Sequence, residues 1–137
     1  MKEKKKIQFI IYGQPIAKGR HRSGKGHAYT PEKTVNYEQM VKISYLRGER
    51  VRFTDEQLKM EITAFLGIPK SISKKNRALM ESGIVRPKKK PDWDNLGKIC
   101  ADALNKIAYN DDSQIVSGSV DKYYSNEPRV EVLIYEV

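Results

Sequence analysis

Two short acidic stretches contain the residues best suited to chemistry. The first is PDWDNLGK at 91–98, and the second is YNDDSQ at 109–114. Pro91 disfavours a helix before it, so the residues that follow are expected to be extended, and residues two apart in an extended chain point to the same side. The carboxylates of Asp92 and Asp94 are therefore expected to face one cation. Mg²⁺ prefers carboxylate and water oxygens and commonly keeps ligand positions for a substrate phosphate.

Two further groups complete this candidate site. Lys98 follows Asp94 by four residues, so in a helix its ammonium lies over the same face, where it can meet a phosphate oxygen or the charge developing on it. Asp94 is also well placed as the N-cap of that helix. A third carboxylate would come from Asp111 or Asp112. Together these residues indicate a divalent-metal site beside a phosphate.

Each part of the pattern also has an ordinary structural interpretation. An isolated Asp-x-Asp before a helix is more often a cap with a solvated charge. Asp111 and Asp112 are typical of a turn, and Lys98 alone is typical of an exposed surface. Cys100 lies on an apolar stripe and is predicted to be a packing residue rather than a nucleophile, because a buried thiol is inert.

Composition limits the class of protein and of partner. The chain has 137 residues, which suits one compact domain spanning 1–137. Its 26 Lys and Arg outnumber 17 Asp and Glu, and the formal charge of +9 suggests a polyanionic partner such as nucleic acid. One cysteine cannot form an intrachain disulfide, and no Cys/His cluster has zinc spacing, so a cytoplasmic protein is expected. The first apolar run is too short for a signal peptide or membrane span.

The first half of the chain is predicted to contain two strands and one helix. Residues 6–13 are β-branched and aromatic and end in a Gly-Gln-Pro turn, which indicates a strand. A helix is predicted from a cap at Thr30 to about Arg47. Its apolar residues at helical spacing are Val35, Met40, Val41 and Leu46. Strict alternation over 58–66 predicts a strand with one buried face.

The clearest helix is predicted over 95–107. Its apolar stripe consists of Leu96, Ile99, Cys100, Ala103, Leu104 and Ile107. Asp102 and Asn105 share the opposite face and are expected to be solvated. Two closing strands are predicted at about 113–124 and 129–136, separated by a turn that contains Pro128.

The Lys- and Ser-rich residues 70–90 are expected to form a mobile basic face with a short helix near 74–81. The complete pattern predicts an α/β (α+β) fold, in which a small mixed β-sheet of about four strands packs with two main helices.

The run PDWDNLGKICADALNKIAYNDDSQIV resembles the signature of the RusA family of crossover junction endodeoxyribonucleases, the Holliday junction resolvases. It has the Asp-x-Asp-Asn-Leu opening, a Lys four residues after the second Asp, an Asp-Ala-Leu in the helix and an Asp-Asp-x-Gln-Val-like close. The segment GQPIAKGRHR resembles the N-terminal strand and basic loop of the family. Trp93 is a departure, because the family more usually has an aliphatic residue there.

The resemblance implies a RusA-like fold and a metal-dependent activity. It implies a homodimeric endonuclease that resolves four-way DNA junctions by paired symmetric nicks, in DNA recombination and repair. The implied metal is Mg²⁺, with Mn²⁺ as the substitute, and no small-molecule cofactor or membrane is involved. The implied metal ligands are Asp92, Asp94 and Asp112, with Asp111 in reserve, and the implied catalytic lysine is Lys98.

Geometry raises a question about the third carboxylate. A helix over 95–107 would place its far end nearly 20 Å from Asp94, at about 1.5 Å per residue. Either the helix ends early, near Asn105, and residues 106–111 double back, or the third carboxylate comes from a partner subunit. The first alternative is the one favoured here. A twofold homodimer would also supply the second active site that two nicks require.

Basic residues outside the acidic stretches are candidates for contact with DNA phosphates. They are Lys18, Arg20, Arg22, Lys88, Lys89 and Lys90. They would neutralise phosphates without reading sequence, although such residues can also be a solvated surface. The alternative function is a non-catalytic basic nucleic-acid-binding module, with the carboxylates as caps and turns. Metal-dependent cleavage separates the two, since a pure binder shows none.

Overall fold

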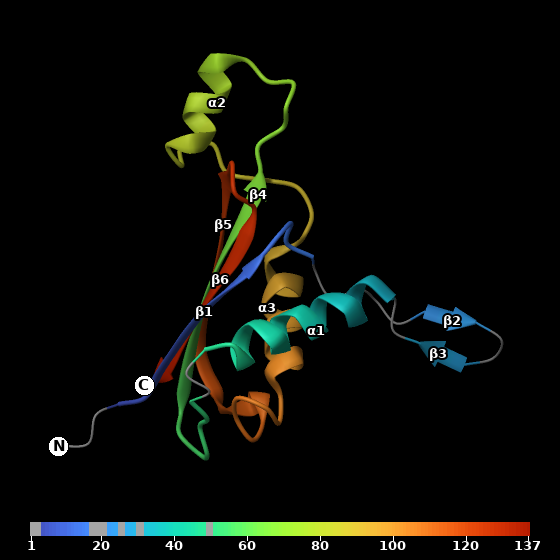
Figure 1. Cartoon of the computed structure of the whole chain (residues 1–137), viewed down its shortest axis with the longest axis vertical. Helices are drawn as coiled ribbons and strands as arrows, with labels where there is room; N and C mark the ends of the chain where they lie inside the picture. The colour runs from blue at the N-terminus through green and yellow to red at the C-terminus, as the bar shows by residue number, and fades with distance from the viewer. Residues whose placement is uncertain (1–3, 17–21, 25–26, 30–31, 49–50) are drawn as a thin grey trace.

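A four-stranded mixed sheet forms the centre of the molecule (Figure 1). The computed structural model describes residues 4–16, 22–24, 27–29, 32–48 and 51–137. The strands of the sheet are β1 (Lys6–Tyr12), β4 (Leu58–Gly67), β5 (Ile115–Ser125) and β6 (Arg129–Glu136), in the order β1-β6-β4-β5. β1 and β4 pair antiparallel with β6, whereas β5 pairs parallel with β4. β5 is therefore an edge strand, and the crossover from β4 that reaches it contains two helices.

Two main helices cover one face of this sheet, as the sequence predicts. The helices are α1 (Glu32–Leu46), α2 (Lys74–Glu81) and α3 (Trp93–Leu104), with a 3-10 turn η1 (Asp112–Gln114) before β5. α1 and α3 cross each other over the sheet, and the short α2 lies beyond its end (Figure 1). A small hairpin, β2 (Arg22–Gly24) and β3 (His27–Tyr29), was not expected from the sequence. None of the helices in the described ranges has the length and apolar character that a membrane span requires.

The core lies between the sheet and the helices α1 and α3. Every second residue of β4, from Leu58 to Leu66, is buried, which confirms the predicted alternation. α3 contributes Leu96, Ile99, Cys100, Ala103 and Leu104 to the core. Cys100 is 1% exposed, and burial raises the pKa of its thiol to about 12. Its assignment as a packing residue is therefore confirmed.

α1 contacts the core through a different stripe from the one predicted. The buried residues are Thr34, Tyr37, Val41 and Tyr45, whereas Val35, Met40 and Leu46 are exposed. Tyrosine rings supply the apolar area here, although their hydroxyl groups make them appear polar in a hydropathy pattern. The ring of Tyr45 packs edge-on against Phe9, with 6.0 Å between centroids, and its hydroxyl donates to the carbonyl of Val51. The predicted helix is confirmed, but its predicted buried stripe is wrong except at Val41. The predicted cap at Thr30 lies outside the described residues.

The basic segment 70–90 makes specific contacts with β5 instead of forming only a loose surface. Ser73 caps α2, because its hydroxyl accepts a hydrogen bond from a backbone N–H of the first turn. The guanidinium of Arg86 lies 4.1 Å from the ring centroid of Tyr123 and donates to the carboxylate of Asp121 at 3.1 Å. These contacts fix the chain that leads from α2 to the start of α3.

Candidate active site

α3 begins earlier than predicted, and this changes how its first carboxylates are placed. The helix starts at Trp93, and its N-cap is Asp92, whose backbone is extended at φ −69° and ψ 149°. Asp94 is therefore in the first helical turn, neither extended nor the N-cap. The prediction that both side chains leave the same side of an extended segment is wrong. Both carboxylates are nonetheless exposed at the N-terminal end of α3.

Asp92 and Asp94 line one open pocket together with four lysines. Lys88, Lys89 and Lys90 come from the loop before α3, and Lys122 comes from β5. The pocket has a volume of about 640 Å³. Lys88, Lys89 and Lys90, which the sequence offers as candidates for DNA contact, thus line the same pocket as the acidic pair.

Lys122 is a member of this pocket that the sequence does not reveal. It pairs with Ala64 of β4, whose side chain is buried beneath the helices, and cross-strand partners share a face of the sheet. The side chain of Lys122 therefore points toward α3, and its ammonium donates to the carbonyl of Lys89. This hydrogen bond ties the lysine loop to the sheet.

The carboxylates of Asp92 and Asp94 are not used as structural groups within the described part of the chain. Asp92 is the N-cap by its backbone, yet its side chain makes no capping hydrogen bond. Neither side chain forms an ion pair or hydrogen bond with another described residue. Lys98 is exposed one turn beyond Asp94 on α3. The interpretation of the acidic pair as a cap is therefore not supported, and the oxygens are accessible to a cation.

The third carboxylate lies at the other end of α3. The helix ends one residue before Asn105, so its predicted early end is confirmed. Residues 106–112 then fold against this C-terminal end, so they do not double back to the start of the helix as the favoured alternative expects. The side-chain oxygen of Asn105 accepts a hydrogen bond from the backbone N–H of Asp112 at 3.1 Å, and the hydroxyl of Tyr109 donates to the carbonyl of Ala101 at 2.7 Å. Asn105 is thus a positioning residue, and its expected role as a solvated residue is wrong.

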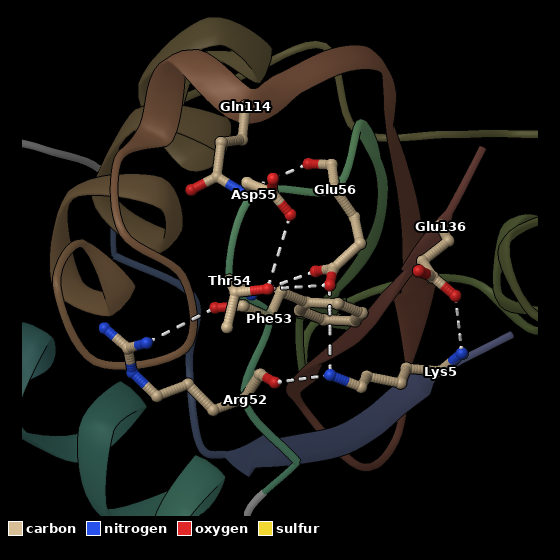
Figure 2. Close-up of polar contacts among 8 residues, drawn as sticks. All are labelled: Lys5, Arg52, Phe53, Thr54, Asp55, Glu56, Gln114 and Glu136. Atoms are coloured by element: carbon tan, nitrogen blue, oxygen red, sulfur yellow. Dashed lines mark hydrogen bonds and ion pairs between the residues drawn. The ribbon is translucent and has the colours of Figure 1, made fainter.

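Gln114 holds the segment that carries Asp112. Its side-chain oxygen accepts hydrogen bonds from the backbone N–H groups of Asn110 and Asp111, both at 2.9 Å. Its side-chain nitrogen donates to the carbonyl of Glu56 at 3.1 Å (Figure 2). From the sequence alone, Gln114 is only one residue of the second acidic stretch. In the fold it connects the segment between α3 and β5 to the loop before β4.

That loop, residues 51–57, is itself fixed by a polar network (Figure 2). The ammonium of Lys5 donates to the carbonyl of Arg52 at 3.3 Å and lies 3.8 Å from the carboxylate of Glu56. The backbone N–H of Phe53 donates to the carbonyl of Ala108 at 2.8 Å. The position of Asp112 therefore depends on Lys5, just before β1, on the loop before β4 and on the end of α3.

Asp111 and Asp112 differ in whether their carboxylates are engaged. The carboxylate of Asp111 accepts hydrogen bonds from the hydroxyl and the backbone N–H of Ser113, and these bonds lower its pKa. It also lies 3.7 Å from the ammonium of Lys106. The half-buried carboxylate of Asp112 accepts no hydrogen bond from the described residues. Burial is the main cause of the raised pKa of Tyr109, and the charge of Asp112 raises this pKa further.

The two halves of the candidate site are separated by the length of α3. The helix has 12 residues and is therefore about 18 Å long. Within the described ranges, no group of three or more His, Cys, Asp or Glu side chains is arranged to hold one metal ion. The fold of one chain brings together Asp92, Asp94 and the four lysines, and it places Asp112 elsewhere.

Part of the predicted DNA-binding set cannot be placed in the same way. Lys18 and Arg20 lie outside the described residues, and Arg22 is described only by its backbone, at the start of β2.

Comparison with known proteins agrees with the sequence motif. Residues 12–135 match the family described as endodeoxyribonuclease RusA. The chain is also 41% identical over 137 residues to the uncharacterized protein YqaN of Bacillus subtilis (strain 168), and the match covers 96% of each chain. The family match extends from the end of β1 into β6 and includes both acidic stretches, and on this ground the chain belongs to the RusA family of endodeoxyribonucleases.

Proposed function

We propose that this protein is a magnesium-dependent endonuclease that resolves four-way DNA junctions by paired symmetric nicks, and that it acts as a homodimer. The observation that carries the proposal is the pair of accessible carboxylates, Asp92 and Asp94, in a pocket otherwise rich in lysine. Carboxylates suit a hard divalent cation, and lysines suit the phosphates around the scissile bond. Membership of an endodeoxyribonuclease family supplies the reaction class.

The donor set at the start of α3 fits Mg²⁺. This ion is usually bound through one or two carboxylates, and substrate phosphate and water complete its octahedron. Asp92 and Asp94 would provide these carboxylates, because neither is engaged by another described residue. Mn²⁺ would fit the same oxygens. When bound, the metal would activate a water molecule and stabilise the leaving oxygen of the phosphodiester.

The surrounding cations have a binding and a catalytic role in this proposal. Lys88, Lys89 and Lys90 line the pocket and would hold the DNA backbone against the acidic pair. Lys98 is exposed on the turn after Asp94, so its ammonium would stabilise charge on the reacting phosphate. Lys18, Arg20 and Arg22 are proposed as further phosphate contacts.

The geometry favours Asp112 of a partner subunit as the third carboxylate. In one chain, Asp112 is held to Asn105 at the far end of α3, about 18 Å of helix away from Asp94. A homodimer in which the two α3 helices run antiparallel would bring the C-terminal end of one to the N-terminal end of the other. Such a dimer would contain two composite sites, which two nicks require. Asp112 is preferred over Asp111, whose carboxylate is already engaged by Ser113.

The direct experiment is to incubate the full chain with a synthetic four-way junction and to titrate Mg²⁺. We expect paired nicks on strands of like polarity, and no cleavage when the metal is removed with a chelator. Binding without metal-dependent cleavage would identify a non-catalytic nucleic-acid-binding module instead. Cleavage of flaps and forks but not of four-way junctions would keep the site and change its substrate.

The residues are tested by removing charge without changing shape. Asp92→Asn and Asp94→Asn should each abolish cleavage while keeping or tightening DNA binding, because each loses a metal ligand and a repulsion from phosphate. Glu127→Gln is the matched control, since Glu127 is an exposed carboxylate in the turn between β5 and β6. Loss of folding in Asp94→Asn, measured by circular dichroism, would show a structural role instead.

A further inference from the structure

The segment between β4 and α3 carries most of the positive charge of the molecule. We call residues 69–90, which contain α2, the α2 arm. The arm has eight Lys and Arg and one acidic residue, Glu81, so its formal charge is +7 in a chain of +9. Like charges gathered in this way repel one another, which destabilises the folded state, and a bound polyanion removes that cost. The function proposed above uses only three of the eight cations, Lys88–Lys90.

The two arginines of the α2 arm fasten it to the sheet. The guanidinium of Arg77 donates to the side-chain oxygen of Asn126, in the turn between β5 and β6, at 3.1 Å. The guanidinium of Arg86 donates to the backbone carbonyl of Lys122 in β5 at 2.8 Å. Both cations are therefore engaged within the fold.

The C-terminal end of α2 is closed by backbone hydrogen bonds and rests on β5. The N–H groups of Ile84 and Val85 both donate to the carbonyl of Leu79 at 3.1 Å. Gly83 has a φ of 84°, which glycine adopts without steric cost, and a Cβ at this position would lie 3.6 Å from the ring of Tyr123. The arm is thus held against the sheet by its backbone as well as by its arginines.

The remaining lysines of the arm, Lys70, Lys74 and Lys75, are exposed. Within the described part of the chain, none of the three forms an ion pair or a hydrogen bond through its side chain. Lys74 and Lys75 are the first two residues of α2, whose first turn contains no acidic residue. Cations at this end of a helix oppose its dipole and destabilise it. The position of these lysines is therefore unfavourable for the free protein.

The α2 arm connects the candidate site to a part of the molecule that projects from it. α2 lies beyond the end of the sheet (Figure 1). The last residues of the arm, Lys88–Lys90, line the pocket of Asp92 and Asp94. The three free lysines near the start of α2 therefore lie outside the pocket, on the same basic segment.

We propose that the α2 arm is a second phosphate-binding surface, on which Lys70, Lys74 and Lys75 hold a duplex arm of branched DNA away from the scissile phosphate. The inference rests on the proposed function, which places the cleaved strand at the pocket. Duplex DNA carries one negative charge per about 1.7 Å of its axis, so a duplex that leaves the pocket presents phosphates to cations along its path. Contacts to the backbone position the DNA and read no sequence. Because the arm is fastened to the sheet, binding does not have to order it, which would cost affinity.

Duplex DNA fits the α2 arm better than an anionic membrane does. A helix that binds at a membrane surface needs large apolar side chains opposite its basic ones. Within the described residues, none of the exposed large apolar side chains belongs to α2. The family to which the chain belongs is one of endodeoxyribonucleases, and the arm leads directly into the pocket that holds the acidic pair.

The test compares two double variants that remove the same charge from opposite ends of the sheet. Binding of the full chain to a synthetic four-way junction is measured with a chelator over a range of salt concentrations. Lys74→Gln with Lys75→Gln should weaken binding about 5-fold at low salt and reduce the slope of log binding constant against log salt concentration by up to about 2. Lys4→Gln with Lys6→Gln is the matched control: both lysines are exposed, and Lys6 pairs with Tyr135 near the end of β6, far from the turn that holds the arm.

The length of the DNA arms separates contact with a duplex from a general effect of charge. Shortening the arms of the junction should lower the affinity of the wild type to that of the Lys74 and Lys75 variant, whose own affinity should change little. Lys70→Gln should act in the same direction, and it lies before α2, so it leaves the helix unchanged. With Mg²⁺ and saturating protein, the double variant should nick at the wild-type rate, because these lysines do not touch the reacting phosphate.

Three results would overturn the proposal. The first is an affinity and salt slope of the double variant equal to those of the wild type, with folding confirmed by circular dichroism. The second is an equal loss in the Lys4 and Lys6 control. The third is a loss of binding to phosphatidylglycerol vesicles, with no loss of binding to DNA, which would assign the arm to a membrane surface.

These binding measurements are independent of nuclease activity. A protein that binds junctions through the α2 arm but nicks none of them would support this surface and refute the proposed function. An active nuclease whose affinity for junctions does not depend on Lys70, Lys74 and Lys75 would support the function and refute the surface.

Discussion

Subunit mixing offers the sharpest test of how the acidic residues cooperate. Asp94→Asn and Asp112→Asn should each be inactive as pure proteins, because each removes a carboxylate from both sites of the dimer. If every site combines Asp94 of one protomer with Asp112 of its partner subunit, a mixed dimer carries both changes in one site and none in the other. Mixing two inactive proteins should therefore restore cleavage.

The expected magnitude follows from counting sites. Random exchange of equal amounts gives mixed dimers as about half of all dimers, and each contains one intact site of two. The mixture should thus have about a quarter of the wild-type number of sites. The assay is nicking of a labelled four-way junction with Mg²⁺ after exchange, with mixed dimers counted by native mass spectrometry. Most products should carry one nick instead of a pair, because a mixed dimer has one working site.

A matched control separates sites shared between subunits from general rescue. Asp94 and Lys98 lie at the same end of the same helix, so Asp94→Asn mixed with Lys98→Ala should restore nothing. Absence of activity in the first mixture, with mixed dimers present, would refute the shared site and return the third carboxylate to the same chain. Activity in the control mixture would refute the assignment of both residues to one site.

Three further predictions concern other parts of the structure. Gln114→Leu should lower the free energy of unfolding by about 2 kcal/mol in urea denaturation, because three hydrogen bonds are lost. Gln114→Glu keeps the acceptor oxygens and should therefore lower the free energy of unfolding less. If Gln114→Leu lowers it no more than Gln114→Glu does, Gln114 does not hold this segment as described. The hydrogen bonds from Ser113 lower the pKa of Asp111, so this carboxylate stabilises the fold above its unfolded pKa, and that contribution is lost as the pH falls through its lower folded pKa. Asp111→Ala should therefore lower the melting temperature at pH 7 and have less effect in strong acid, and an equal effect at both pH values would contradict this. Replacing Lys88–Lys90 with alanine should reduce the slope of log binding constant against log salt concentration by up to about 3, and an unchanged slope would show that these lysines do not contact phosphate.

The sequence was sufficient for the elements whose burial depends on a local period. β4 alternates residue by residue, and α3 carries an apolar stripe of 3.6-residue period, so each pattern predicts both the element and its buried face. The acidic stretches and their family resemblance likewise lie within short segments of the chain. The composition indicates a polyanionic partner, since charge can be counted without coordinates.

α1 shows where a hydropathy pattern is not enough. Its buried face depends on Tyr37 and Tyr45, and whether such amphipathic rings face the core is decided by the neighbours that they find there. The first residue of α3 is also predicted wrongly from the sequence, because the helix starts at Trp93 instead of Asn95. Both Asp92 and Asp94 are good N-cap residues, and a local pattern does not distinguish them, whereas in the fold the helix begins directly after Asp92.

The sequence by itself determined which residues can do chemistry here, because carboxylates and lysines at short spacings are local properties of the chain. Only the tertiary structure decided their separation. It placed Lys122 beside Asp92 through the pairing of β5 with β4, and it placed Asp112 at the opposite end of α3 through Asn105 and Gln114. Strand register joins residues that are distant in sequence, and so does the hydrogen bond from Gln114 to Glu56, and a local pattern carries no information about either.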